Sequence, residues 1–479
     1  MTQISTENQQ SLSDRTDARA VTLGFVAIVA AMLPAVLDQT ILATALPTIA
    51  GDLGSITDLS WVVTAYVVAA AATTPLWGKL GDRHGRKRML ELSLVVFVTS
   101  SALCAAAQDI TQLVVTRLVQ GVAAGGLMTL AMAVVGDLVA PRERGRYQGY
   151  IAATFAVATI VGPLLGGVLV ESASWRWVFL VNLPLGAVAL VGLALRLPAP
   201  EQGRPERPLD SLGAVLLAGS TSAFMLTCIW GGQRFGWGSP EILGLIGTTV
   251  LVGSALVARE RRAADPIVPL HLLRTRPVAV ASAALFLATA ALFSITVFVP
   301  LFLQTTTGAS PTEAGLLLAP AMLGITVSTT LSGRSISRTG RYKRFPVAGL
   351  LLMSAALVLL AALAGEPSQL ATGVGLVVFG FGFGMVGQVL IVAVQNSVER
   401  QELGVATATT GFFRAVGGAV GAAVLGAVFA SQAGHGAAGI ADGVQTAFLV
   451  AAPLAALGAL VVLMLDEVPL AERLSPARG

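Results

Sequence analysis

Long apolar segments alternate with short polar turns along almost the whole chain. A helix needs about 20 mostly apolar residues to cross the hydrocarbon core of a bilayer, and each segment is about that length. The sequence therefore predicts an all-α integral membrane protein. Fourteen transmembrane helices are predicted, at residues 21–46, 59–77, 89–107, 111–136, 147–170, 177–195, 211–231, 241–258, 277–304, 312–333, 345–364, 369–396, 404–430 and 444–465.

The composition supports a membrane environment. Of the 479 residues, 55% are hydrophobic and only 12% are charged, whereas soluble domains are about 25% charged. The net charge of +4 is what basic loops beside a membrane produce, so it gives no support to a nucleic-acid partner. Cys104 and Cys228 each lie in an apolar segment, and two cysteines without a ligand spacing predict neither a disulfide framework nor a metal site.

The basic residues predict how the helices are oriented. With the N-terminus inside, 26 of the 30 Lys and Arg residues fall in inner tails and loops. The other four are Arg117 and Arg414, within spans, and Arg176 and Arg234, in outer loops. Because inner loops retain Lys and Arg, both termini are predicted to be cytoplasmic. Residues 1–20 and 466–479 form the tails, and the polar start lacks the features of a signal peptide.

An internal repeat divides the chain. A shift of 255 residues, read from the sequence, places Gly162 and Gly166 on Gly417 and Gly421. The same shift aligns five positions of a second motif, Gly78, Arg83, Gly85, Arg86 and Arg88, with Gly333, Arg338, Gly340, Arg341 and Lys343. Parallel repeats of this kind build transporters from two similar bundles. Six-helix bundles are predicted at 21–196 and 277–465, with a two-helix insertion and its flanking loops at 197–276.

Two charges are predicted to lie deep in the membrane. Asp38 is the one acid of 26 that lies far from the ends of a span. Burying a charge there costs about 2.5 kcal/mol or more, so Asp38 is expected to face a polar cavity and to exchange protons. Alternatively, it is held permanently in a salt bridge. Arg117 shares a helix face with Gln120; it either controls the proton on Asp38 or only satisfies carbonyls and polar side chains.

The hairpin 78–88 carries five basic residues and one acid. An ordinary inner loop would also be basic. Its spacing resembles the signature loop between helices 2 and 3 of the major facilitator superfamily, at Gly78, Leu80, Asp82, Arg83, Gly85, Arg86 and Lys87. The resemblance implies that Gly78, Asp82, Arg83, Gly85 and Arg86 form a gating loop that latches the two halves. Asp82 is expected to accept hydrogen bonds from a helix N-terminus, and Arg83 and Arg86 to pair with acids such as Asp137 or Glu143.

Three further motifs resemble those of fourteen-helix drug:proton antiporters. The first-helix motif is matched at 37–47, with Ala43 where the usual residue is Asn, and the fourth-helix motif at 117–121. The fifth-helix antiporter motif is matched at 158–167, with Ala158 in place of its first glycine and with Gly162, Pro163, Gly166 and Gly167. Proline kinks a helix, and small residues form a groove for close packing.

The resemblance implies a proton-coupled secondary active exporter of amphipathic small molecules, with multidrug or antibiotic efflux as the expected activity. Arg414 and the absence of an acid in span 404–430 argue against strong specificity for dications. Glu313, at the outer end of span 312–333, either binds at the mouth or caps a helix. Candidate cavity residues, which could instead make helix-packing hydrogen bonds, are Gln39, Trp61, Tyr66, Gln120, Gln388, Gln395 and Asn396.

Two alternatives stay open. The chain could be a dedicated exporter of an endogenous metabolite, antibiotic or lipid. It could also be a transport-inactive membrane sensor or assembly partner, although Asp38, Arg117 and the fifth-helix motif argue against this. An enzyme is not expected, because no P-loop and no nucleophile–base or metal-ligand spacing is present.

The remaining expectations follow from these interpretations. No cofactor or metal is expected, since the proton gradient would supply the energy. The expected partners are a small amphipathic substrate, protons and membrane lipid, with the chain acting as a monomer. Arg outnumbers Lys by 27 to 3, a bias typical of GC-rich genomes, so the predicted location is a bacterial inner membrane.

Overall fold

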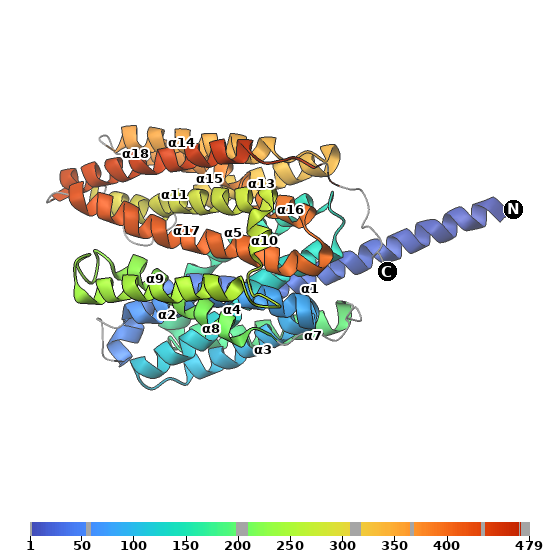
Figure 1. Cartoon of the computed structure of the whole chain (residues 1–479), viewed down its shortest axis with the longest axis horizontal. Helices are drawn as coiled ribbons and strands as arrows, with labels where there is room; N and C mark the ends of the chain where they lie inside the picture. The colour runs from blue at the N-terminus through green and yellow to red at the C-terminus, as the bar shows by residue number, and fades with distance from the viewer. Residues whose placement is uncertain are drawn as a thin grey trace.

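The computed structural model describes residues 2–53, 59–197, 209–306, 318–364, 368–432, 436–468 and 470. These residues are almost entirely helical, and the long helices run side by side in one elongated bundle (Figure 1). Thirteen helices among them are long and apolar enough to cross a membrane. The prediction of a helical, multi-pass membrane protein is therefore confirmed, while the count of fourteen spans is not.

The first half of the molecule is built around α4, which packs on α2 and α3, while α1 packs on α5 and α7. The short α6 continues into α7, and together they form one span. The helices of this half are α1 (Thr2–Leu53), α2 (Leu59–His84), α3 (Arg86–Ala105), α4 (Ile110–Leu138), α5 (Arg144–Ser172), α6 (Trp177–Leu180) and α7 (Asn182–Arg196).

The second half repeats this packing pattern. Here α15 packs on α13 and α14, while α11 packs on α17 and α18. Each half has its own buried apolar core. The helices are α11 (Arg276–Thr306), α13 (Ala319–Thr339), α14 (Arg344–Leu363), α15 (Gln369–Gly384), α16 (Gly387–Ser397), the 3-10 turn η1 (Arg400–Glu402), α17 (Leu403–Gln432) and α18 (Gly436–Leu463).

Two extra helices cover the junction of the halves. α8 (Ser211–Trp230) packs on both α2 and α17, and α9 (Pro240–Glu260) packs on α8. The short α10 (Leu270–Arg274) then leads into α11. A small apolar cluster joins α2, α8 and α17 and consists of Val68, Ala71, Met225, Cys228, Ala419 and Ala423.

The segment predicted as the N-terminal tail is helical where the structure describes it. α1 begins at Thr2 and runs without a break to Leu53, so the polar segment 2–20 continues the first span as a helix that projects from the bundle (Figure 1). The sequence has neither Gly nor Pro before Gly24. Without these strong helix breakers, nothing in the local sequence ends the helix where the apolar residues begin.

The expected hairpin 78–88 is also more helical than predicted. α2 extends to His84 and α3 begins at Arg86, so Gly85 alone makes the turn. Gly85 has φ 97°, and Gly340, its partner in the repeat, has φ 69° after α13. Side chains other than hydrogen are disfavoured at positive φ, which explains a glycine at both positions.

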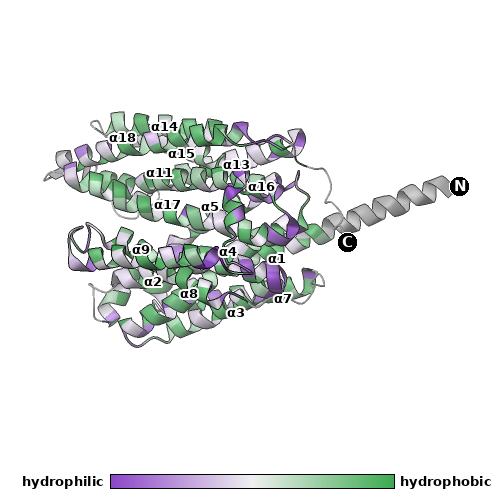
Figure 2. Ribbon diagram, in the orientation of Figure 1, coloured by the Kyte–Doolittle hydropathy of each residue, from purple (hydrophilic) through white to green (hydrophobic). Residues whose placement is uncertain are grey.

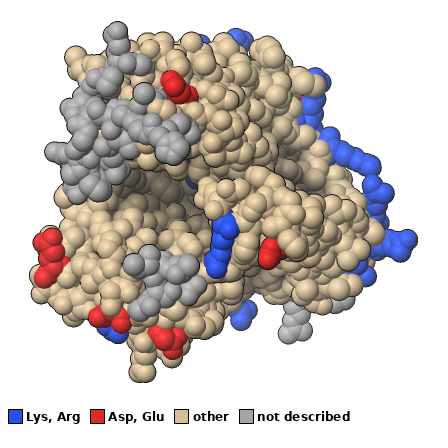
Figure 3. All heavy atoms as spheres, turned by 90° about the vertical axis from the view of Figure 1, so that its left-hand side faces the viewer, with Lys and Arg blue, Asp and Glu red and all other residues tan. Residues whose placement is uncertain are grey.

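The two halves meet where α2 packs on α17 and α5 packs on α13. We call the end of the bundle that carries Lys79, Arg83, Arg86, Arg142 and Arg144 the basic end. Hydrophilic residues gather at this end, where α1 also enters the bundle (Figure 2). Seen from the opposite end, the surface is hollowed between the two halves (Figure 3). The molecule is thus closed at the basic end and hollowed at the other.

Candidate functional site: a buried carboxylate and an inter-half latch

Asp38 and Arg117 form an ion pair in the core of the first half. Their side chains are 0% and 1% exposed, and Arg117 Nη1 donates to Asp38 Oδ2 at 2.5 Å. Arg117 Nε also donates to the carbonyl of Val62 at 3.1 Å. Its guanidinium lies 4.2 Å from the centre of the Tyr66 ring, a cation–π distance. The pair therefore ties α1, α2 and α4 together.

Three polar side chains complete this network. Gln120 and Asn182 donate to Asp38 Oδ1 at 3.0 and 3.3 Å, and Gln120 also accepts from Arg117 at 2.8 Å. The hydroxyl of Ser101 accepts from Asn182 at 2.9 Å and from Gln120 at 3.2 Å. Both carboxylate oxygens are thus hydrogen-bonded, which is the condition for burying a charge.

The surroundings of Asp38 differ from the expected polar cavity. Its side chain is enclosed by α1, α2, α4 and α7, and no surface of it is exposed. In this conformation the carboxylate is satisfied by protein groups instead of water. The sequence placed Gln120 on the same helix face as Arg117, whereas it assigned no role to Ser101 or Asn182. A polar residue inside an apolar span was the signal that could have found them.

The fifth-helix motif packs α5 directly against the segment of α1 that carries Asp38. A Cβ added at Gly162 would overlap the Thr40 hydroxyl, and one at Gly166 would lie 2.8 Å from the Ile41 carbonyl oxygen. Thr40 Oγ1 donates to the Ala158 carbonyl of α5 at 3.2 Å. Pro163 lies inside α5, which stays a single helix in the secondary structure. The glycines therefore serve close helix packing.

This groove allows a matched test. Replacing Gly166 by Ala should destabilise the protein by about 1–3 kcal/mol, because the added methyl overpacks the contact with α1. Gly167 has no atom within 4 Å of the position of a Cβ, so Gly167→Ala should be neutral. Thermal unfolding of the two purified variants in detergent checks this. Equal midpoints would contradict the assigned role of Gly166.

Asp82 links the two halves at the basic end. Its Oδ1 accepts from the backbone N–H of Gly404 at 2.9 Å, and Oδ2 accepts from that of Val405 at 2.7 Å. These N–H groups belong to the first turn of α17, where backbone donors lack helical partners and attract negative charge. The expected contact with a helix N-terminus is therefore present. Gly78 permits it, since a Cβ there would lie 2.7 Å from the Gly404 carbonyl oxygen.

Arginines extend this latch to both sides. Arg86 donates to Asp82 at 2.6 Å, to Asp137 at 2.5 Å and to the carbonyl of Arg400 at 2.5 Å. Arg83 pairs with Asp265 at 3.0 Å and not with Asp137 or the other expected acid, Glu143. Lys79 shares the same carboxylate. The insertion thus supplies the counter-charge, which no short-range pattern indicated.

A second set of contacts closes the basic end around α5. Arg142 donates to the carbonyls of Ser337 and Arg338 at 2.8 and 2.7 Å. Arg144 donates to the carbonyls of Gly136 and, at 3.1 Å, Gln395. Backbones approach closely here, because a Cβ at Gly145 would lie 3.0 Å from the Cα of Gly333. The sequence had indicated only that the inner loops are basic, and it gave Arg142 and Arg144 no separate role.

The seven candidate cavity residues do not form one group. Tyr66 and Gln120 are buried in the Asp38 network. Gln395 is buried at the closed end, where it donates to the Met132 carbonyl at 3.1 Å, and Asn396 donates to the Val468 carbonyl at 3.3 Å. These four make packing hydrogen bonds or latch contacts in this conformation. The other three keep some exposed surface, as Asn396 does: Gln39, Trp61 (4.8 Å from the Trp230 ring) and Gln388.

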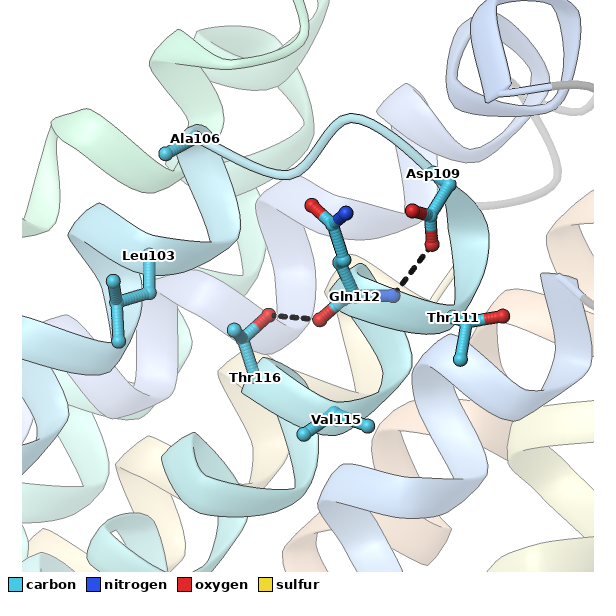
Figure 4. A pocket seen from close by; sticks show the side chains of 7 residues that line it. All are labelled: Leu103, Ala106, Asp109, Thr111, Gln112, Val115 and Thr116. Carbon is cyan, nitrogen blue, oxygen red and sulfur yellow. Dashed lines mark hydrogen bonds between the residues drawn. The ribbon is translucent and has the colours of Figure 1, made fainter.

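A surface pocket of about 570 Å³ lies elsewhere, at the turn between α3 and α4 (Figure 4). Its acid, Asp109, accepts from the backbone N–H of Gln112 at 2.8 Å and so caps α4. The pocket therefore gives no separate site for chemistry. Within the residues that the structure describes, no group of His, Cys, Asp and Glu could hold a metal ion. Glu313 lies outside the described residues.

Comparison with known proteins places the chain in a family. The family model of the Major Facilitator Superfamily matches residues 28–422. An uncharacterised transporter of this type from Mycobacterium tuberculosis is 42% identical over 407 residues. That match covers 85% of this chain but only 59% of the relative, so the chain spans less than two thirds of that protein's length.

Two other relatives are named for an activity. The multidrug transporter protein MdtP of Bacillus subtilis is 33% identical over 414 residues, 86% of this chain and 76% of MdtP. The efflux pump FUS6 of Gibberella moniliformis is 34% identical over 439 residues, 89% of this chain and 77% of that pump. The chain is thus similar to proteins named for drug transport and for efflux.

The fold agrees with a solved transporter. The proton:xylose symporter XylE matches with a TM-score of 0.66 over 93% of this chain and 95% of its own, at 14% identity. Such low identity supports the fold alone. The family match and the curated relatives carry the assignment: the chain belongs to the Major Facilitator Superfamily.

Proposed function

We propose that this transporter is a proton-coupled antiporter that exports amphipathic small molecules, and that it belongs to the fourteen-helix drug:proton antiporters. The single observation that carries the proposal is the fully buried Asp38–Arg117 pair. An acidic residue inside a membrane span, paired with a basic residue such as Arg117, is by default interpreted as a functional site. The multidrug and efflux names of its relatives support the substrate type and the direction.

The geometry gives Asp38 a means of coupling. A proton on its carboxylate would cancel the negative charge that holds Arg117, while the guanidinium stays positive. The ion pair would then be lost, and a weaker hydrogen bond from the guanidinium to a neutral carboxyl group would remain. Arg117 would keep its bond to the Val62 carbonyl, so the packing of α1 relative to α2 and α4 would depend on the proton.

The contacts also support a route from this site to the two halves. The α1 segment next to Asp38 packs into the glycine groove of α5, and α5 packs on α13 across the interface. A change in α1 would therefore reach the interface through rigid helices. Breaking the Asp82 latch and closing the hollow at the other end would exchange access between the two sides, as transporters with paired repeats do.

We further propose that both termini are cytoplasmic, in a bacterial inner membrane, and that α13 is the fourteenth span. α13 packs inside the bundle against α5 and α15. α1 enters the bundle at the basic end, and the chain returns there, because Leu470 donates its backbone N–H to the Gly340 carbonyl at 3.2 Å. An even number of spans brings both ends of a chain to one face. On this assignment the structure is open to the outside.

The test is transport by the full chain in inside-out membrane vesicles whose interior is acidified. Several lipophilic cations and neutral antibiotics should accumulate, and an ionophore that collapses the pH gradient should abolish accumulation. Accumulation that persists without the gradient would reject proton coupling. No accumulation of any compound, from protein shown to be folded, would favour the alternative of a dedicated exporter of an endogenous product.

A further inference from the structure

Arg414 is a second cation deep in the membrane, and it lies outside the Asp38 network. It belongs to the α17 span, about 15 Å along the helix from Gly404 at 1.5 Å per residue. Its side chain is partly exposed. Within the described residues it has neither an ion pair nor a side-chain hydrogen bond, and its backbone carbonyl accepts from the Thr289 hydroxyl of α11 at 2.9 Å. A charge in this environment calls for an oppositely charged or polar partner.

The helix contacts indicate where this side chain points. Gly411, Arg414 and Gly418 follow the spacing i, i+3, i+7 and share one face of α17. A Cβ at Gly411 would lie 3.7 Å from Thr74 of α2, in the first half, whereas one at Gly418 would meet no atom within 4 Å. The face thus starts at the contact with the other half and continues into open space. The surface of the molecule is hollowed between these halves (Figure 3).

The charged side chains within the spans determine the electrostatic character of the space between the two halves. Asp38 and Arg117 also lie within spans, but they neutralise each other and are buried. Arg414 is therefore the deep charge that the inter-half space can reach in the described part of the chain. A guanidinium is ionised at all physiological pH values and binds carboxylate, sulfonate or phosphate groups through paired N–H donors. Low-dielectric walls would strengthen its attraction for anions.

We propose that Arg414 is a specificity-determining residue that binds the acidic group of the substrate, so that amphipathic organic anions are a substrate class of this transporter. The inference rests on the proposed function, since it supposes that the space between the halves holds the exported molecule. It adds a substrate class to the lipophilic cations and neutral antibiotics with which the proposed function is tested. Arg414 would recognise the anion, whereas Asp38 would carry the proton.

Binding of two dyes to the purified full chain, without any gradient, tests the proposal. Fluorescein and rhodamine 6G share a xanthene ring system but carry opposite charge at neutral pH. Fluorescein should bind the wild-type chain more tightly. Its affinity should fall about tenfold or more in Arg414→Gln, as expected for loss of a hydrogen bond to a charged group. Arg414→Lys should restore most of the affinity, and rhodamine 6G should bind Arg414→Gln no more weakly than wild type.

The control is Arg234→Gln, which removes an exposed cation from the turn between α8 and α9 and should leave both affinities unchanged. Thermal unfolding shows whether each variant is folded. The proposal is overturned if wild type binds no fluorescein or prefers rhodamine 6G, or if folded Arg414→Gln keeps fluorescein affinity within about twofold. Charge-selective binding without gradient-driven transport would reject the antiport function and leave this inference standing.

Discussion

Replacing Asp38 by Asn is expected to abolish proton-driven export and to destabilise the protein. The substitution removes the group that would carry the proton, and it leaves Arg117 buried at 1% exposure without its counter-charge. Breaking a buried ion pair by removing one partner costs about 3–5 kcal/mol. Export is measured as gradient-driven accumulation in inside-out vesicles, and stability as the thermal unfolding midpoint in detergent.

The two effects can be separated with a charge-balanced variant. Asp38→Asn combined with Arg117→Gln removes both charges, and replacing a complete buried pair is often close to neutral for stability. The double variant should therefore unfold near the wild-type temperature and still fail to export. Gradient-dependent export by either variant would place the proton site elsewhere. An unstable double variant would instead assign the network a mainly structural role.

Replacing Asp82 by Asn is expected to open the basic end. The carboxylate accepts from the N–H groups of Gly404 and Val405 and from Arg86, and a hydrogen bond to a charged group contributes about 1.5–3 kcal/mol. Asn keeps one oxygen but loses the charge and one acceptor. Because about 1.4 kcal/mol corresponds to a tenfold change in an equilibrium constant, the ratio of open to closed molecules should rise about 10- to 100-fold. Export should fall as the closed state is lost.

Arg88 and Thr339 are exposed positions on the two halves. The distance between spin labels attached at these two positions, measured by electron paramagnetic resonance, should increase when the basic end opens. The native cysteines, Cys104 and Cys228, are buried, which favours selective labelling. Glu91→Gln is the matched control. It removes an acid at the same end whose partner, Lys87, is only four residues away at 3.8 Å. An unchanged distance in Asp82→Asn, or an equal change in the control, would contradict the latch.

The helical membrane fold could be predicted because hydropathy is a local property of each segment. The helix ends could not, as α2 and α3 show. Charged residues from Lys79 to Arg88 were assigned to a loop, yet they continue the helices up to a single glycine turn. Several of these charges are held by partners in α4, in the insertion and in the second half, so the helix need not end where the apolar residues do.

The contacts of Asp82 and Arg83 also show which features could be predicted from the local sequence and which could not. That Asp82 could accept from a helix N-terminus followed from chemistry and from the superfamily resemblance. That Arg83 pairs with Asp265 could not be predicted, because the two residues are brought together by the path of the insertion. Likewise, Ser101 and Asn182 join the Asp38 network only because α3 and α7 pack beside α1 and α4.

The sequence by itself determined the membrane environment, the repeat, the two intramembrane charges and the motifs that indicated the superfamily. These features depend on composition and on spacing along one segment. Only the tertiary structure decided that Asp38 is enclosed rather than exposed, that the basic end is closed, and that Arg414, unlike Arg117, has no ion pair among the described residues. Such properties depend on contacts between residues far apart in the chain, since burial and charge balance are set by neighbours in space.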